Sequence, residues 1–142
     1  RLIELAIFII ALSVSFNLFY LKKEIDFPKK HNDWVKVQIW AKNNTTPNSK
    51  FLVPFSQSGF RVYSQRPIVA DIKDGAVVIY SKDYATSWNE VRMDLQNYDT
   101  LEDADFIKLK VKYKFDFIAT EKRQELNFEK VYSNDRYNVY KL

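Results

Sequence analysis

The chain has 142 residues, a net charge of +4 and a hydrophobic fraction of 46%, enough for one small core beside an apolar anchor. It contains no cysteine and only two glycines. Thiolate metal sites are therefore excluded, and so are Gly-rich phosphate loops, which need several closely spaced glycines. The basic residues are scattered among acidic ones and belong to no known nucleic-acid-binding motif, so we expect no nucleic-acid partner.

The most apolar segment comprises residues 2–21, in which Glu4 is the only charged residue. At about 1.5 Å per residue, a helix of this length spans roughly 30 Å, the thickness of a hydrocarbon core. Its C-terminal end carries two aromatic residues and then two lysines, a pattern typical of a membrane interface: Phe19, Tyr20, Lys22 and Lys23. We therefore predict a transmembrane helix over residues 1–22 and expect the lipid bilayer to be a partner.

Three other interpretations of this segment stay open. A helix buried in a protein core is possible, although such helices are usually shorter or patterned. A cleaved signal peptide would use Arg1 as its basic end, but no small-x-small site precedes Lys22. A single-pass signal anchor also fits. Because the chain begins with Arg, we expect it to have been cut from a longer protein, which favours the last helix of a multi-pass protein.

A polar linker containing Pro28 is predicted over residues 23–32, followed by a soluble domain over residues 33–142. Asn32 or Asp33 is suited to cap a helix over residues 34–43. Four residues of that helix form one apolar stripe that should face the core: Trp34, Val37, Trp40 and Ala41. An Asn- and Thr-rich segment then ends the helix.

The next segments alternate short apolar runs with polar ones. Residues 51–54 and 67–70 each read as a buried strand, and one or two helical turns are expected between them. Residues 71–75 are predicted to form a loop with a turn at Asp74 and Gly75. The run 76–80 is short and fits either helix or strand.

The clearest helical pattern covers residues 86–97, where Ser87 and Glu90 form a capping box. Residues 101–117 fit helical spacing and strand alternation at once. We predict a helix over 101–112 and a strand over 115–120, because a helix followed by a strand continues the preceding order. Apolar and polar residues alternate over 128–132 and 137–142 around a polar turn, which indicates a terminal hairpin.

These elements predict a small three-layer α/β domain with a short, mostly parallel sheet and a C-terminal antiparallel hairpin, preceded by one transmembrane helix. Strands separated by helices usually pair in parallel through right-handed crossovers. An antiparallel hairpin at the edge of such a sheet is common.

The sequence offers little for catalysis. His31 is the only histidine and lies in the predicted linker, so a Ser-His-Asp triad or a histidine metal site lacks its usual parts. The many carboxylates are better explained as caps, turns and solvated helix faces than as acid–base pairs. We therefore predict no catalytic residue, no metal site and no cofactor.

Four cations near aromatic residues are the candidates for binding a ligand or a lipid headgroup: Arg61, Arg66, Lys73 and Arg92. Loops at the C-terminal ends of parallel strands are where α/β sheets bind ligands, and arginine can hold a phosphate or carboxylate with a bidentate fork. The alternative is that these cations pair with nearby aspartates or stack on aromatic faces such as Phe60, Tyr63, Tyr80 and Trp88.

Several motifs occur in an order that resembles the C-terminal domains of multi-pass bacterial membrane proteins. The opening motif consists of Trp34, Trp40, Asn44-Thr45-Thr46-Pro47 and Phe51-Leu52-Val53-Pro54. It is followed by Phe60–Pro67, Asp71–Gly75, Trp88 with Arg92, and Tyr113–Ile118. The parents of such domains are similar to polytopic glycosyltransferases that use lipid-linked sugars. The Trp-Trp-Asp-Tyr signature of oligosaccharyltransferases is absent from the chain.

The resemblance implies an accessory domain outside the cytoplasm, with the catalytic aspartates elsewhere in the parent protein. Expected partners are the remaining transmembrane part of that parent and a lipid-linked sugar or its acceptor. The lysines after the apolar segment would place the domain in the cytoplasm if counted alone, but only one flank of the helix is visible. A membrane-tethered, non-enzymatic binding module of the cell envelope is the alternative.

Overall fold

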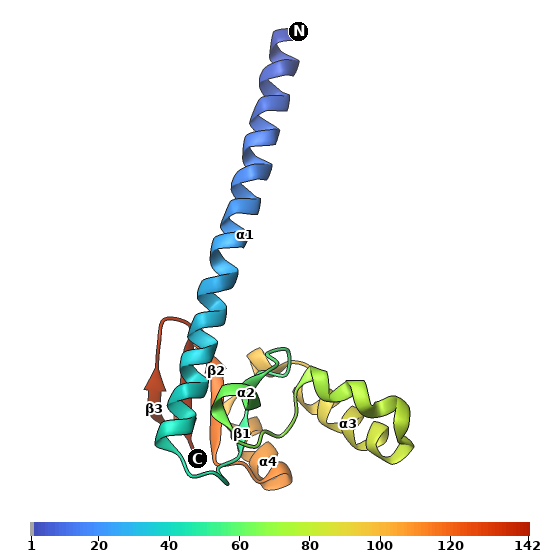
Figure 1. Ribbon diagram of the computed structural model, residues 1–142, viewed down its shortest axis with the longest axis vertical. Helices are drawn as coiled ribbons and strands as arrows, with labels where there is room; N and C mark the ends of the chain where they lie inside the picture. Colours follow the sequence, from blue (N-terminus) through green and yellow to red (C-terminus); the bar gives the residue numbers. More distant parts are fainter. Residues whose placement is uncertain (1) are drawn as a thin grey trace. The chain divides into compact units, whose positions relative to one another are not determined.

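The chain is described by a computed structural model that covers the backbone of residues 2–142 and the side chains of residues 8–17 and 31–142 (Figure 1). It divides into two compact units, the first ending at Asn32 and the second comprising Asp33–Leu142. Helix α1 runs over Leu2–Asn44 and contributes residues to both units. The expected linker over residues 23–32 is therefore helical, and the predicted helix start at Trp34 is wrong.

The predicted membrane span coincides only in part with the described side chains. Residues 8–17 are all exposed, whereas the side chains at 2–7 and 18–22 lie outside the described residues. Over the residues that the structure describes, no helix has both the length and the apolar character required to cross a membrane.

The second unit contains a four-stranded sheet with the order β1-β2-β4-β3. Its strands are β1 (Phe51–Leu52), β2 (Phe117–Glu121), β3 (Glu129–Ser133) and β4 (Tyr137–Lys141). Only β1 and β2 pair in parallel, while β4 is antiparallel to both β2 and β3. The terminal hairpin is thus confirmed, and the expectation of a mostly parallel sheet is wrong.

The sheet is less parallel than predicted because residues 67–70 do not extend into a full strand. They make one isolated parallel bridge, between Ile68 and Phe51. Asp71 then caps the 3-10 helix η1 (Ile72–Tyr80) by accepting hydrogen bonds from the backbone N–H groups of Lys73 and Asp74, which ends the extended stretch. The predicted loop and turn at Asp74 and Gly75 are therefore part of a helix.

Alternating side chains of the strands build a core on each face of the sheet. On one face, Phe51 and Ala119 pack with Trp34, Val37 and Ala41 of α1 and with Phe60 of α2 (Phe60–Ser64). On the other face, Leu52, Ile118 and Tyr140 pack with Leu95, Phe106 and Leu109. These last residues belong to α3 (Lys82–Leu95) and α4 (Asp103–Tyr113), so helices cover both faces. Three members of the predicted α1 stripe are buried, and Trp40 is partly buried.

Helix α3 begins earlier than its sequence pattern indicated. Ser81 is the N-cap and accepts a hydrogen bond from the Tyr84 N–H, while Ser87 donates to the Asp83 carbonyl within the helix. Helix α3 packs along η1 (Figure 1), where a Cβ atom at Gly75 would lie 2.6 Å from the ring of Trp88. Glycine at position 75 therefore permits this close approach.

Residues 101–117, which fitted both helical and strand patterns, form a helix followed by a strand, as predicted. The short 3-10 helix η2 (Tyr98–Thr100) leads into α4, whose start is held by the Glu102 N–H donating to Asp105. Helical spacing prevails because Phe106 and Leu109 both reach the core on one side of α4. Lys114 ends the helix in a left-handed conformation, with a φ of 53°.

Candidate functional site

Arg61 and Lys73 lie near each other in the fold but do not share a ligand site. The guanidinium of Arg61 forms a bidentate pair with Asp74, at 2.8 and 2.9 Å. Although burial alone would raise the pKa of Asp74, the hydrogen bonds from Arg61 and from the Asp71 backbone hold that pKa below its ordinary value. Arg61 is thus neutralised within the protein, and Lys73 is left with an exposed side chain.

Arg66 has a structural role. It is only 8% exposed. Its guanidinium donates to the carbonyls of Lys42 and Thr45, at 2.6 and 2.7 Å, and to the Thr45 hydroxyl at 3.0 Å. Carbonyls in the last turn of a helix lack intrahelical partners, so Arg66 caps the C-terminus of α1. Its remaining nitrogen donates to the carbonyls of Ser64 and Gln65, which leaves no donor for a ligand.

Arg92 is held by its own helix. Its Nε and one terminal nitrogen donate to the side-chain oxygen of Asn89, at 3.1 and 3.0 Å. Of the four predicted cations, Arg61 and Arg66 are committed to protein oxygens and Arg92 is partly so. The pairing of Arg61 with Asp74 matches the alternative that these cations pair with nearby aspartates.

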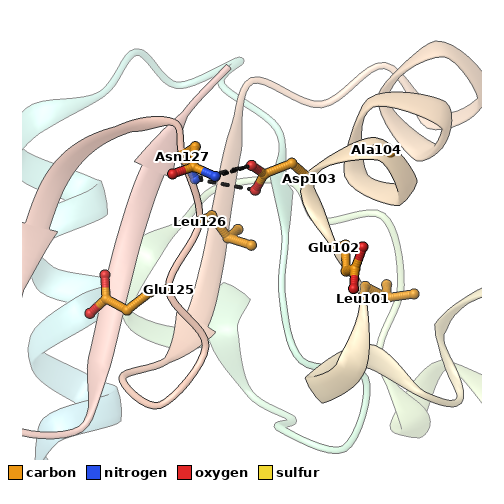
Figure 2. A pocket seen from close by; sticks show the side chains of 7 residues that line it. All are labelled: Leu101, Glu102, Asp103, Ala104, Glu125, Leu126 and Asn127. Carbon is orange, nitrogen blue, oxygen red and sulfur yellow. Dashed lines mark hydrogen bonds between the residues drawn. The ribbon is translucent and has the colours of Figure 1, made fainter.

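A hollow of about 390 Å³ lies where α4 begins, next to the segment after β2 (Figure 2), and carries three carboxylates: Glu102, Asp103 and Glu125. Asp103 accepts hydrogen bonds from the Asn127 backbone and side chain, the shortest at 2.7 Å. A hydrogen bond from Lys130 lowers the pKa of Glu125 below its ordinary value. The described residues also contain no cluster suited to a metal ion.

A second hollow, of about 420 Å³, lies on the outer side of α4. It is lined by Ile107, Lys110, Val111, Lys114, Phe115 and Asp116. Ile107 is 53% exposed and Val111 is 77% exposed. Two large aliphatic side chains thus face solvent one helical turn apart, with a lysine next to each.

The lysines of α4 differ in their partners. Lys108 pairs with Asp105 at 3.2 Å, and Lys112 pairs with Asp94 at 2.7 Å. Within the described part of the chain, no side-chain partner is found for Lys110 or Lys114. We call Ile107, Lys110, Val111 and Lys114 the α4 outer face. Its cations remain available to a ligand, whereas Arg61 and Arg66 do not.

A third group of exposed side chains is mainly apolar, although the exposed Lys73 lies on the same 3-10 helix. It comprises side chains of α2 and η1: Val62, Tyr63, Ile72, Val77, Ile79 and Tyr80. The salt bridge between Arg61 and Asp74 lies at its edge. We call these six residues the η1 surface.

The sequence contained a signal for the α4 outer face that the prediction did not use. At about 100° per residue, positions 107, 110, 111 and 114 fall within roughly one third of a helix circumference. The prediction instead weighed a strand-like alternation of apolar residues in this segment: Ile107, Leu109, Val111, Tyr113, Phe115 and Phe117.

Comparison with known families gives one match, over residues 32–94, to a family described as a domain of unknown function, DUF6798. The matched segment is less than half of the chain and ends within α3, before α4 and the hairpin. Comparisons with characterised proteins and with solved structures find no match.

Proposed function

We propose that this chain is the C-terminal accessory domain of a polytopic membrane protein, held at the cell membrane by the helix over residues 2–21. The α/β unit acts by binding and carries no catalytic residue. One observation supports this more than any other, namely the exposure of the apolar part of α1.

Residues 8–17 expose large apolar side chains around the whole helix: Phe8, Ile9, Ile10, Leu12, Val14 and Phe16. A helix that is apolar on all sides needs an apolar surrounding, either a large core or a bilayer. One polar side chain here bonds within the helix, since the Asn17 amide donates to the Ser13 carbonyl at 2.8 Å. Internal satisfaction of this kind is what a lipid environment requires.

Membrane association can be tested by extraction and flotation of the full chain. We expect the chain to float with vesicles and to resist alkaline extraction. The double variant Ile9→Lys/Leu12→Lys should be released, because each charge at the centre of a membrane helix costs about 2.5–3.5 kcal/mol. Val62→Lys, an equally drastic change on the soluble unit, is the control and should remain bound. A chain that stays dissolved and monomeric without detergent would contradict the proposal.

The finer proposal is that the parent transfers sugars from lipid-linked donors and that this domain lies outside the cytoplasm. It is supported by the motif resemblance between Trp34 and Ile118. Because the chain has no cysteine, Glu129→Cys on β3 gives a unique label at an exposed site outside the η1 surface. A membrane-impermeant maleimide should label it in intact cells, and labelling only after lysis would place the domain in the cytoplasm. Incorporation of labelled sugar by membranes containing the full-length parent tests the transferase activity.

A tethered, non-enzymatic binding module is the second candidate. The η1 surface favours it, because six exposed large apolar side chains on two elements joined by the Arg61–Asp74 pair are typical of an interaction site. In the leading proposal, the membrane portion of the parent covers this surface. In the second candidate, another envelope protein covers it. Many upstream spans in the complete gene favour the first, and a single span favours the second.

A further inference from the structure

We propose that the α4 outer face binds the surface of a membrane containing anionic phospholipids. This inference rests on the proposed tether for the proximity of the lipid and deepens it by naming a second lipid contact. It concerns residues outside the segment that matches the known family.

The first support is the pattern of charge pairing along α4. Four lysines occur at alternate positions from 108 to 114. Lys108 and Lys112 each have a carboxylate partner on the protein, whereas Lys110 and Lys114 have none among the residues described. Both unpartnered lysines line the second hollow. The positive charge of α4 is therefore concentrated beside the second hollow.

Other charges around this hollow leave it positive. Asp116 is the one acidic residue in its lining, and its carboxylate accepts a hydrogen bond from the Lys50 N–H at 2.8 Å. The Lys50 ammonium donates to the Tyr113 carbonyl at 2.9 Å, at the end of α4. The lining thus carries two lysines and one aspartate that is already hydrogen-bonded to the backbone, which favours an anionic ligand.

The second support is the pair of aliphatic side chains between these lysines. A free phosphate or a purely acidic segment would gain nothing from Ile107 and Val111, which are left exposed in the fold. Interfacial helices combine such residues, because the aliphatic groups enter the acyl boundary while lysines reach the phosphates. The η1 surface lacks this concentration of free cations, so we assign the lipid contact to α4.

A weak surface is sufficient for this role. A domain joined covalently to an anchor meets the bilayer at high effective concentration, so a few favourable contacts decide its orientation. Each lysine near an anionic surface contributes about 1 kcal/mol. Two lysines together therefore shift the docked-to-undocked ratio by roughly thirtyfold.

The test uses the full chain in nanodiscs, with a polarity-sensitive dye on a single introduced cysteine. Val111→Cys reports the α4 outer face, and Ile79→Cys reports the η1 surface, since both native side chains are 77% exposed. With phosphatidylglycerol present, the dye at position 111 should shift to the blue and brighten, while the dye at position 79 should not. Pure phosphatidylcholine should give a much smaller change.

Two matched double variants then distinguish binding by the unpartnered lysines from a general effect of the helix's positive charge. Lys110→Gln/Lys114→Gln should reduce the docked-to-undocked ratio at position 111 by roughly thirtyfold. Lys108→Gln/Lys112→Gln removes the same formal charge from the same helix but affects lysines that have protein partners, and its effect should be several-fold smaller. Circular dichroism of each variant confirms that the fold is kept.

Three results would overturn the inference: a dye response that ignores phosphatidylglycerol, equal effects of the two double variants, or insertion at position 79 instead of 111. A response only to an added acidic protein would also overturn it. Flotation of the same samples reports the tether separately. If the chain floats with the lipid but the dye at position 111 does not respond, the α4 contact alone is refuted. If the chain does not float, the tether is refuted.

Discussion

The C-terminal ends of α1 and α4 both have a cation beside them, but the two cations are in different situations. At α1 the cation is Arg66, which comes from a distant segment and is buried against the last carbonyls of the helix. At α4, the Lys50 ammonium bonds the Tyr113 carbonyl, while Lys114, the next residue in the chain, has an exposed side chain. Arg66 completes the fold, whereas Lys114 remains available to a partner.

This difference shows that residue type and position relative to a helix do not determine a cation's role. Arg66 is committed because α2 and the segment after it pack over the end of α1. No comparable segment of the described chain covers the outer face of α4. A buried cation must satisfy its donors within the protein, whereas an exposed lysine keeps its solvation and can exchange it for a ligand.

The largest expected effect comes from removing the buried cation. Arg66→Ala leaves the carbonyls of Lys42 and Thr45 without their donor, so we expect a loss of about 3 kcal/mol in the free energy of unfolding. Urea unfolding of the full chain in detergent, followed by tryptophan fluorescence, measures it. Arg92→Ala removes a half-buried arginine that bonds to Asn89 of its own helix; it is the control and should change stability by less than about 1 kcal/mol. Equal losses would remove the distinction between the two kinds of cation.

A smaller effect concerns the paired side of α4. Hydrogen bonds from Lys112 and Tyr113, at 2.7 and 2.6 Å, lower the pKa of Asp94. Because the folded-state pKa is below the unfolded one, this carboxylate stabilises the fold above about pH 4 and less as pH falls further.

Asp94→Asn should therefore be less stable than the native chain at neutral pH, by under about 1 kcal/mol, and the difference should shrink in acid. Unfolding curves at several pH values measure this. A constant difference for Asp94→Asn would mean that the charge is not what matters.

The smallest effect separates stability from binding at the free cation. Lys114 adopts a left-handed conformation that glycine reaches without strain. Lys114→Gly should therefore raise the unfolding free energy by roughly 0.5–1 kcal/mol while weakening the response to anionic lipid. Thermal unfolding and the dye assay measure the two quantities on one variant. A variant that loses both stability and lipid response would assign Lys114 to the fold.

Local patterns predicted the elements better than their partners. The α1 stripe, the helix that became α4 and the terminal hairpin all followed from apolar spacing. The predicted start of α3 was wrong because both Ser81 and Ser87 are suitable N-cap residues by sequence. Only Ser81 directly follows η1 in the fold and caps the helix. The sequence also left the partners of the candidate cations open, because neither the Asp74 partner of Arg61 nor the α1 carbonyls beside Arg66 can be predicted from spacing.

The sequence by itself determined the apolar segment, the mixture of helices and strands, and the lack of parts for common catalytic sites. Tertiary structure alone decided which strands pair and which cations stay free. Periodicity is set by neighbours within a few residues, whereas pairing depends on groups brought together from far along the chain. Residues 67–70 stop after one bridge and β4 returns beside β2, so the sheet is mostly antiparallel although its elements alternate as in a parallel fold.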